Sequence, residues 1–140
     1  MQLTFLKPDL KTKCPLPFCM SPVKAGFPSP AEDYIEHSLD LNQLLVRHPA
    51  ATFFVRVEGD SMIDAGINEG DILVVDKSIT SSHKKIVIAA VDGEFTVKRL
   101  FLENGNIFLY PENPNFKPIK IQENTDFEVW GVVTYVIHKA

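Results

Sequence analysis

From residue 51 onward, hydrophobic and polar residues follow patterns typical of β-strands. Phe53, Val55 and Val57 alternate with three residues of which two are charged, which is the two-residue period of a strand with unlike faces. Asp92-Gly93 and Asn104-Gly105 are typical of tight hairpin turns. Further strands are predicted at 71–76, 86–91, 94–102, 107–110, 119–121 and 127–137, with a proline-containing loop at 111–118. About seven short strands with punctuated turns predict a mainly β, compact antiparallel domain over 29–140.

The pattern before residue 29 is different, because six of the ten prolines lie in the first 30 residues. Proline has a fixed φ and no amide donor, so it disfavours a regular helix or a central strand. Residues 1–28 are therefore predicted to form an extended arm, whose apolar residues, Leu3 and Phe5 among them, suit it to docking on a partner surface.

One or two short helices are predicted between the arm and the first strand. Ser29, Pro30 and Glu32 match a capping box with proline at the first helical position, which predicts a helix through about Ser38. Asp40 is suited to cap a second helix over 41–47.

Composition excludes several classes of protein. The chain has 140 residues, 45% of them hydrophobic, which is enough for one core and argues against wholesale disorder. Its 14 basic and 18 acidic residues give a net charge of −4, which argues against binding nucleic acid by bulk electrostatics. The longest apolar run, Ile86–Val91, is far shorter than the roughly 20 residues of a membrane span, and the N-terminus lacks a signal-peptide core. We therefore expect a soluble, cytoplasmic protein without a membrane partner.

No metal or cofactor is expected. Cys14 and Cys19 are separated by four residues in the proline-rich stretch, with no third and fourth ligand near them. The four histidines are scattered along the chain without metal-ligand spacing. Two reduced thiols on the arm fit this pattern better than a disulfide framework or a metal site.

Gly59-Asp60-Ser61-Met62 follows a predicted strand directly. Glycine allows a sharp turn, which can present Ser61 as a nucleophile with neighbouring backbone N–H groups receiving an oxyanion. The same four residues also fit an ordinary strand-ending turn.

Lys98 is the best candidate for the base that such a serine requires. It lies among apolar residues on the predicted strand 94–102, and burial disfavours the ammonium form. A neutral amine near pH 7 requires the lysine pKa to fall by about 3 units. The alternative is that Lys98 extends its charge into water, and the pattern does not decide whether Lys98 or Arg99 points inward.

Ala25-Gly26 lies near the end of the predicted arm. Two small residues allow a catalytic site to approach the peptide bond closely, although they also fit an ordinary hinge. The chain between Gly26 and Ser61 is long enough for the arm to reach the site of its own subunit or of a second one.

Together these features resemble the LexA/UmuD family of self-cleaving serine–lysine peptidases, and the resemblance covers nearly the whole chain after the first dozen residues. It implies a LexA-like β-domain in which Ser61 is the nucleophile, Lys98 is the general base, and the backbone amides of Asp60 and Ser61 hold the oxyanion. It also implies self-cleavage between Ala25 and Gly26, where UmuD-type members often carry Cys-Gly, so the rate is expected to differ. The matching blocks are 26–31, 40–45, 59–64 and 89–98.

The resemblance further implies partners that composition does not reveal. Cleavage would be stimulated by a RecA–single-stranded-DNA filament in the SOS response to DNA damage. The product, residues 26–140, would remain a homodimer and act with a UmuC-type polymerase in translesion synthesis, without sequence-specific DNA binding of its own.

Other functions fit the sequence less well. A repressor requires a DNA-binding domain, and only 25 residues precede Gly26. A signal peptidase requires a membrane anchor, and the sequence pattern predicts no membrane span. The alternative from another class is a non-catalytic module that binds a polymerase or RecA, in which Ser61 and Lys98 are structural. The distance between these two side chains is the observation that separates the hypotheses best.

Overall fold

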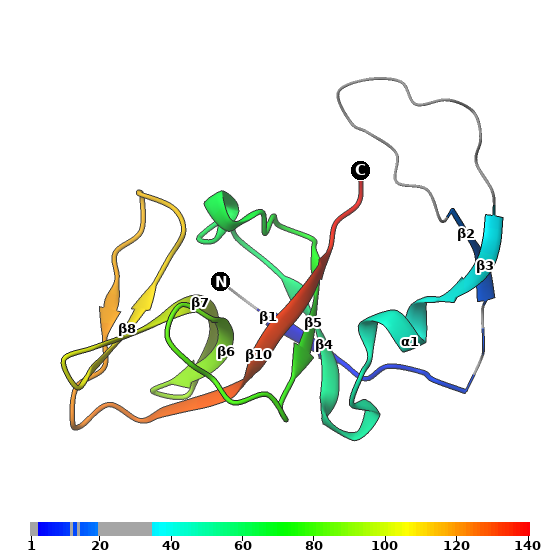
Figure 1. The fold of residues 1–140 in the computed structure, drawn as a ribbon. Helices are drawn as coiled ribbons and strands as arrows, with labels where there is room; N and C mark the ends of the chain where they lie inside the picture. The colour runs from blue at the N-terminus through cyan, green and yellow to red at the C-terminus, as the bar shows by residue number, and fades with distance from the viewer. Residues whose placement is uncertain (1–2, 12, 14, 20–34) are drawn as a thin grey trace. The chain divides into compact units, whose positions relative to one another are not determined.

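The computed structural model describes residues 3–11, 13, 15–19 and 35–140 (Figure 1). The chain divides into two units, which we treat separately. The larger unit contains Met1–Pro8 and His48–Ala140, and the smaller contains Asp9–Arg47. Among the described residues, no helix is long and apolar enough to cross a membrane.

The larger unit is an eight-stranded sheet in which every pair of neighbouring strands is antiparallel (Figure 1). The prediction of a mainly β, LexA-like antiparallel fold is therefore confirmed. The strand order is β1-β4-β5-β10-β6-β7-β8-β9. The strands are β1 (Leu3–Leu6), β4 (Thr52–Val57), β5 (Ile72–Asp76), β6 (Ile86–Val91), β7 (Glu94–Glu103), β8 (Asn106–Tyr110), β9 (Ile119–Lys120) and β10 (Phe127–Ile137), with short 3₁₀ turns at Pro49–Ala51 and Ile63–Ala65.

Both predicted hairpin turns are confirmed. Asp92 and Gly93 join β6 to β7 with φ angles of 48° and 82°, and Asn104 and Gly105 join β7 to β8 with 50° and 78°. Two consecutive positive φ angles are what the tight hairpin turn requires, and they match the right-handed twist of the strands.

Strand β10 lies between β5 and β6 and so connects the two halves of the sheet. Its register shifts by a bulge against each neighbour, between Val129 and Gly131 on one side and between Val133 and Tyr135 on the other. At Gly131 the strands come so close that a Cβ atom would lie 2.7 Å from a methyl group of Val75. Only glycine fits at this position without a shift of its neighbours, because real Cβ atoms essentially never make contacts of that length.

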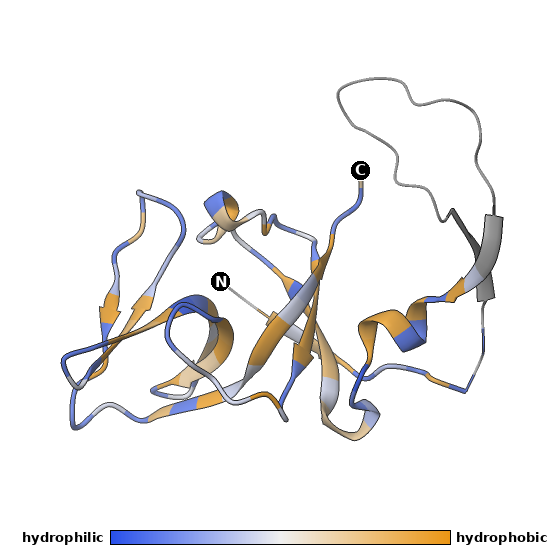
Figure 2. Cartoon of the chain, in the orientation of Figure 1, coloured by the Kyte–Doolittle hydropathy of each residue, from blue (hydrophilic) through white to orange (hydrophobic). Residues whose placement is uncertain are grey.

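Apolar residues concentrate in the strands, and polar residues in the connections (Figure 2). The apolar residues form two buried clusters. One includes Val55, Met62 and Ile88, and the other includes Val87 and Leu109. Consecutive residues of β6 thus enter different clusters. Because β6 is covered on both faces, 86–91 is a continuous apolar run and not an alternating one.

The smaller unit pairs β2 (Pro15–Cys19) with β3 (Ile35–Asp40) in antiparallel fashion and ends in α1 (Leu41–Leu45). The Asp40 side chain caps α1 as predicted, accepting a hydrogen bond of 2.9 Å from the Asn42 amide. The helix is shorter than the predicted 41–47.

The predicted helix from Ser29 through about Ser38 is wrong in its last part. Residues 35–38 belong to β3, where pairing with β2 overrides the local helical signal. The beginning of that helix, Ser29, Pro30 and Glu32, lies outside the described residues.

Candidate active site

Ser61 sits in the turn that directly follows β4. Gly59 has a φ of 93°, a conformation that other residues rarely adopt, and this reverses the chain at the end of the strand. Met62 is fully buried in the core cluster and anchors the turn from within. As a result Ser61 is only 3% exposed, so its hydroxyl lies in a largely water-free setting.

The loop after β8 holds this turn from the other side. The Glu112 amide donates to the Ser61 carbonyl at 2.9 Å, and the Asp64 amide donates to the Glu112 carbonyl at 2.8 Å. The Asn113 side chain, itself 8% exposed, donates to the Asp60 carbonyl at 2.9 Å. These three bonds fix the backbone on both sides of the serine.

Lys98 and Arg99 are neighbours on β7 with different surroundings. Arg99 donates from Nε to the Glu112 carboxylate at 2.5 Å and from Nη1 to the Lys84 carbonyl at 2.7 Å, so it holds the loop that supports Ser61. Lys98 is 6% exposed and does not extend into water. The structure thereby decides the question that the sequence pattern left open, since Lys98 is the buried one of the two.

Three oxygen atoms surround the amine of Lys98. Its Nζ lies 2.7 Å from Thr96 Oγ1, 3.1 Å from the Val97 carbonyl and 3.2 Å from Ser61 Oγ. A neutral amine has two N–H groups and one lone pair. It can donate to Thr96 and Val97 while its lone pair accepts the Ser61 O–H, which is the arrangement that proton transfer from the serine requires.

Burial changes the charge state of this amine. Desolvation lowers the pKa of Lys98 from 10.5 to about 8. At pH 7 about a tenth of the lysine is therefore neutral, and at pH 9 about nine tenths. The pKa therefore falls by slightly less than a neutral amine near pH 7 requires.

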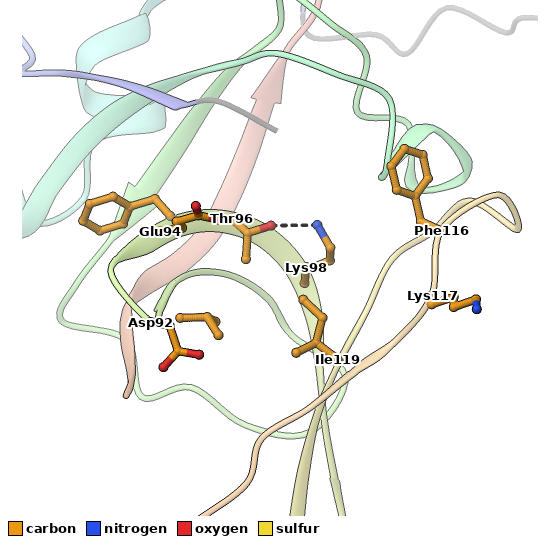
Figure 3. A pocket seen from close by; sticks show the side chains of 9 residues that line it. Asp92, Glu94, Thr96, Lys98, Phe116, Lys117 and Ile119 are labelled. Carbon is orange, nitrogen blue, oxygen red and sulfur yellow. Dashed lines mark hydrogen bonds between the residues drawn. The ribbon is translucent and has the colours of Figure 1, made fainter. Parts of the chain in front are cut away.

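A cavity of about 530 Å³ opens beside Lys98, which lies in its wall (Figure 3). Thr96 and Lys98 line it from β7, while Phe116 and Lys117 line it from the loop after β8. The lining combines apolar side chains with charged ones of both signs, including Asp92. A space of this size and composition can admit a short extended peptide.

The structure brings Ser61 and Lys98 within hydrogen-bond distance. The cleavage-site residues Ala25 and Gly26 lie outside the described residues. The assignment of the Asp60 and Ser61 amides to an oxyanion stays a prediction.

Two supporting residues escaped the sequence analysis. Thr96 had a usable signal, because residues two apart on a strand share a face and Thr96 precedes Lys98 by two. Asn113 had none, since an asparagine between two prolines is typical of any turn.

A family model and several known proteins match most of the chain. The family model described as Peptidase S24-like matches residues 17–134. Protein MucA of Salmonella typhimurium is 49% identical over 121 residues, which is 86% of this chain and 82% of that protein. Protein SamA of Salmonella typhimurium strain LT2 is 53% identical over 115 residues, 82% of this chain and 79% of that protein. LexA repressor 1 of Geobacter sulfurreducens is 47% identical over 100 residues, which is 71% of this chain but 49% of the repressor.

Proposed function

Since the chain belongs to the Peptidase S24-like family, we propose that it is a serine–lysine peptidase that cuts its own chain between Ala25 and Gly26. The observation that carries this proposal is the 3.2 Å separation of Lys98 Nζ and Ser61 Oγ, both buried, with the lysine pKa lowered to about 8. Burial is costly for a lysine with only a structural role, whereas a general base requires a lowered pKa and contact with its nucleophile.

The proposed reaction proceeds in two steps. The neutral amine of Lys98 takes the proton of Ser61, and Ser61 Oγ attacks the carbonyl carbon of Ala25. Backbone amides around Asp60 and Ser61 stabilise the oxyanion. The Lys98 ammonium then returns its proton to the Gly26 nitrogen as the C–N bond breaks. Water next attacks the ester on Ser61 while Lys98 accepts a proton from it. The bond between Ser61 Oγ and the Ala25 carbonyl carbon then breaks, Lys98 returns the proton to Ser61 Oγ, and residues 1–25 leave with a new carboxylate.

We place this reaction in the SOS response. The supporting observations are the identity of about half of the aligned residues to MucA and SamA and the resemblance to UmuD-type proteins. The activator would be a RecA–single-stranded-DNA filament, which raises the population of a cleavage-ready arm. The processed chain would act as a homodimer with a UmuC-type polymerase in translesion synthesis.

Incubation of the purified protein at a series of pH values, followed by mass measurement, tests the proposal. We expect a fragment that begins at Gly26, formed about tenfold faster at pH 9 than at pH 7 because the neutral fraction of Lys98 rises by that factor. Ser61→Ala and Lys98→Ala should both abolish it. A chain that stays intact at pH 9 and with activated RecA would instead favour the non-catalytic binding module.

A further inference from the structure

Strand β1 covers one edge of the sheet. It pairs antiparallel with β4, from Leu3 opposite Val57 to Leu6 opposite Phe54, and it is the terminal strand of the sheet order. Without β1, the main-chain N–H and C=O groups along one side of β4 would be exposed. Such an edge is a template for pairing with another extended chain.

An aromatic surface beside this edge receives the side chain of Phe5. The Phe5 ring lies 4.8 Å from the ring of Phe95, 5.6 Å from that of Phe53 and 6.0 Å from that of Trp130, between ring centroids. Leu3 packs against the core cluster, whereas Phe5 itself remains 38% exposed. The segment is thus held by strand pairing and by one partly covered aromatic side chain, and little of it belongs to the core.

Trp130, whose ring lies beside that of Phe5, also carries a polar group that is unpaired within the described part of the chain. Its indole Nε1 is buried without a hydrogen-bond partner among the residues that the structure describes. An unpaired buried donor is costly, so the residues around this indole are not optimally satisfied. Lys77 Nζ lies 4.6 Å from the centre of the Trp130 ring, which keeps one face of the indole beside a cation.

Cleavage at Ala25–Gly26 would separate β1 from β4, because the bond lies between them in the sequence. The covalent link holds β1 near β4 at an effective concentration on the order of millimolar, roughly a thousandfold above a micromolar solution of severed peptide. The pairing of β2 with β3 also spans the bond, but a two-stranded sheet with prolines at 15 and 17 is marginal by itself. A four-residue strand that is docked in the intact chain would therefore leave after the cut.

We propose that the β4 edge, with Phe53, Phe95 and Trp130, is a strand-binding groove that the chain's own residues 3–6 close and that cleavage opens. Its occupant after cleavage is an extended apolar segment of a partner protein with an aromatic residue in the place of Phe5. The removal of residues 3–6 from the groove by cleavage, which we call the unmasking step, rests on the proposed self-cleavage. The groove and its preference for such a segment do not.

Binding of a synthetic peptide of residues 1–11 to uncut full-length chains tests the groove without any cleavage. All chains carry Ser61→Ala so that they stay intact, and Phe5→Asp or, separately, Leu3→Asp displaces the resident strand. We expect the labelled peptide to bind both displaced chains at least tenfold more tightly than the Ser61→Ala parent. Trp130, the only tryptophan of the chain, should report binding by a change in emission.

Two controls fix the interpretation. A chain with Leu102→Asp, which changes a leucine of similar exposure on another strand, should bind no better than the parent. A peptide with Phe5→Ala should lose most of its affinity for the displaced chains. Equal binding to all chains, or no binding to either displaced chain at about 1 mM peptide, would overturn the groove. If the groove binds but self-cleaved wild-type protein retains residues 1–25, the unmasking step is wrong.

Discussion

The burial that makes the amine of Lys98 available as a base also lowers the stability of the folded chain. A lysine with a pKa of about 8 in the folded chain still carries its charge in most molecules at pH 7, in a place where only three oxygen atoms replace water. Keeping an ammonium there is unfavourable, and the same unfavourable term makes the amine available as a base. The rate and the stability of the protein should therefore respond in opposite directions to changes at this position.

Replacement of Lys98 by methionine should stabilise the fold at neutral pH. Between about pH 8 and 10.5 the unfolded chain binds a proton that the folded chain has lost, so the free energy of unfolding of the parent rises with pH across this window. We expect Lys98→Met to be more stable than the parent by about 1–3 kcal/mol at pH 7, with the difference shrinking towards pH 10.5. Urea unfolding of both chains in a Ser61→Ala background measures it. A methionine variant that is less stable at pH 7 would contradict the desolvation argument.

Arginine at position 98 should preserve the charge and remove the activity. The guanidinium cannot lose its proton in this pH range, so the base is absent at every pH. We expect Lys98→Arg to cleave at least about a hundredfold more slowly than wild type, without the rise through pH 8. Lys117→Arg, on a lysine that lines the same cavity, is the matched control and should keep the wild-type pH profile. Near-normal cleavage by Lys98→Arg would refute the assignment of the base.

Thr96 should act as a positioning residue through its bond of 2.7 Å to Lys98 Nζ. Thr96→Val keeps the shape of the side chain but removes this oxygen. The ammonium then loses an acceptor, so the midpoint of the pH–rate profile should move below 8 while the maximal rate falls about tenfold. Thr96→Ser should restore both values. A lower rate with an unchanged midpoint would indicate a merely structural role.

The loop between β8 and β9 should hold the backbone on both sides of Ser61 in position. Asn113 bonds the Asp60 carbonyl, and its own Oδ1 accepts from the Asn115 amide at 3.0 Å. Asn113→Leu leaves both backbone groups without these partners, so we expect a loss of about 1–3 kcal/mol in unfolding free energy and slower cleavage. Asn124→Leu, in the later turn at 122–125, is a control that should leave cleavage unchanged. Normal cleavage by Asn113→Leu would show that the loop does not position the serine.

Local chemistry was enough to predict most of the strands of the larger unit. The turn pairs Asp92-Gly93 and Asn104-Gly105 specify their hairpins through a few neighbouring residues, and β6 and β10 have the predicted bounds. The candidate pair Ser61 and Lys98 could also be predicted from the sequence, because each residue lies in a short block, 59–64 or 89–98, that resembles the LexA/UmuD family.

Features that depend on contacts distant in the sequence were not accessible. Nothing near 35–38 indicates that pairing with β2 would displace a helix, and nothing near Phe5 indicates a partner on β4. Lys98 is buried beside Ser61, whereas Arg99 pairs with Glu112. Both partners are distant in the sequence, so the residues next to Lys98 and Arg99 on β7 do not indicate which of the two is buried.

The proposed activity requires the Ser61–Lys98 pair to act on a bond in the predicted arm, 35 residues before the serine in the sequence. Because of its net charge of −4, the chain is poorly suited to approach nucleic acid directly, so any effect of single-stranded DNA on cleavage should act through a protein contact. The intact chain also keeps two strand pairings that span the bond, β1 with β4 and β2 with β3. One cut would therefore change both the length of the chain and the surface it presents.

A bulky residue at position 25 should separate cleavage from folding. A tryptophan cannot approach Ser61 as closely as alanine, so Ala25→Trp should block the fragment that begins at Gly26. Residue 25 belongs to the predicted arm, so we expect the free energy of unfolding to change by no more than about 0.5 kcal/mol. Ala25→Gly, which keeps the site small, should still be cut, and mass measurement with urea unfolding of both variants checks the pair of expectations. If Ala25→Trp is cut at the wild-type rate, the scissile bond lies elsewhere in the chain, and the role of residues 3–6 as a removable cover would have to be tied to that other bond.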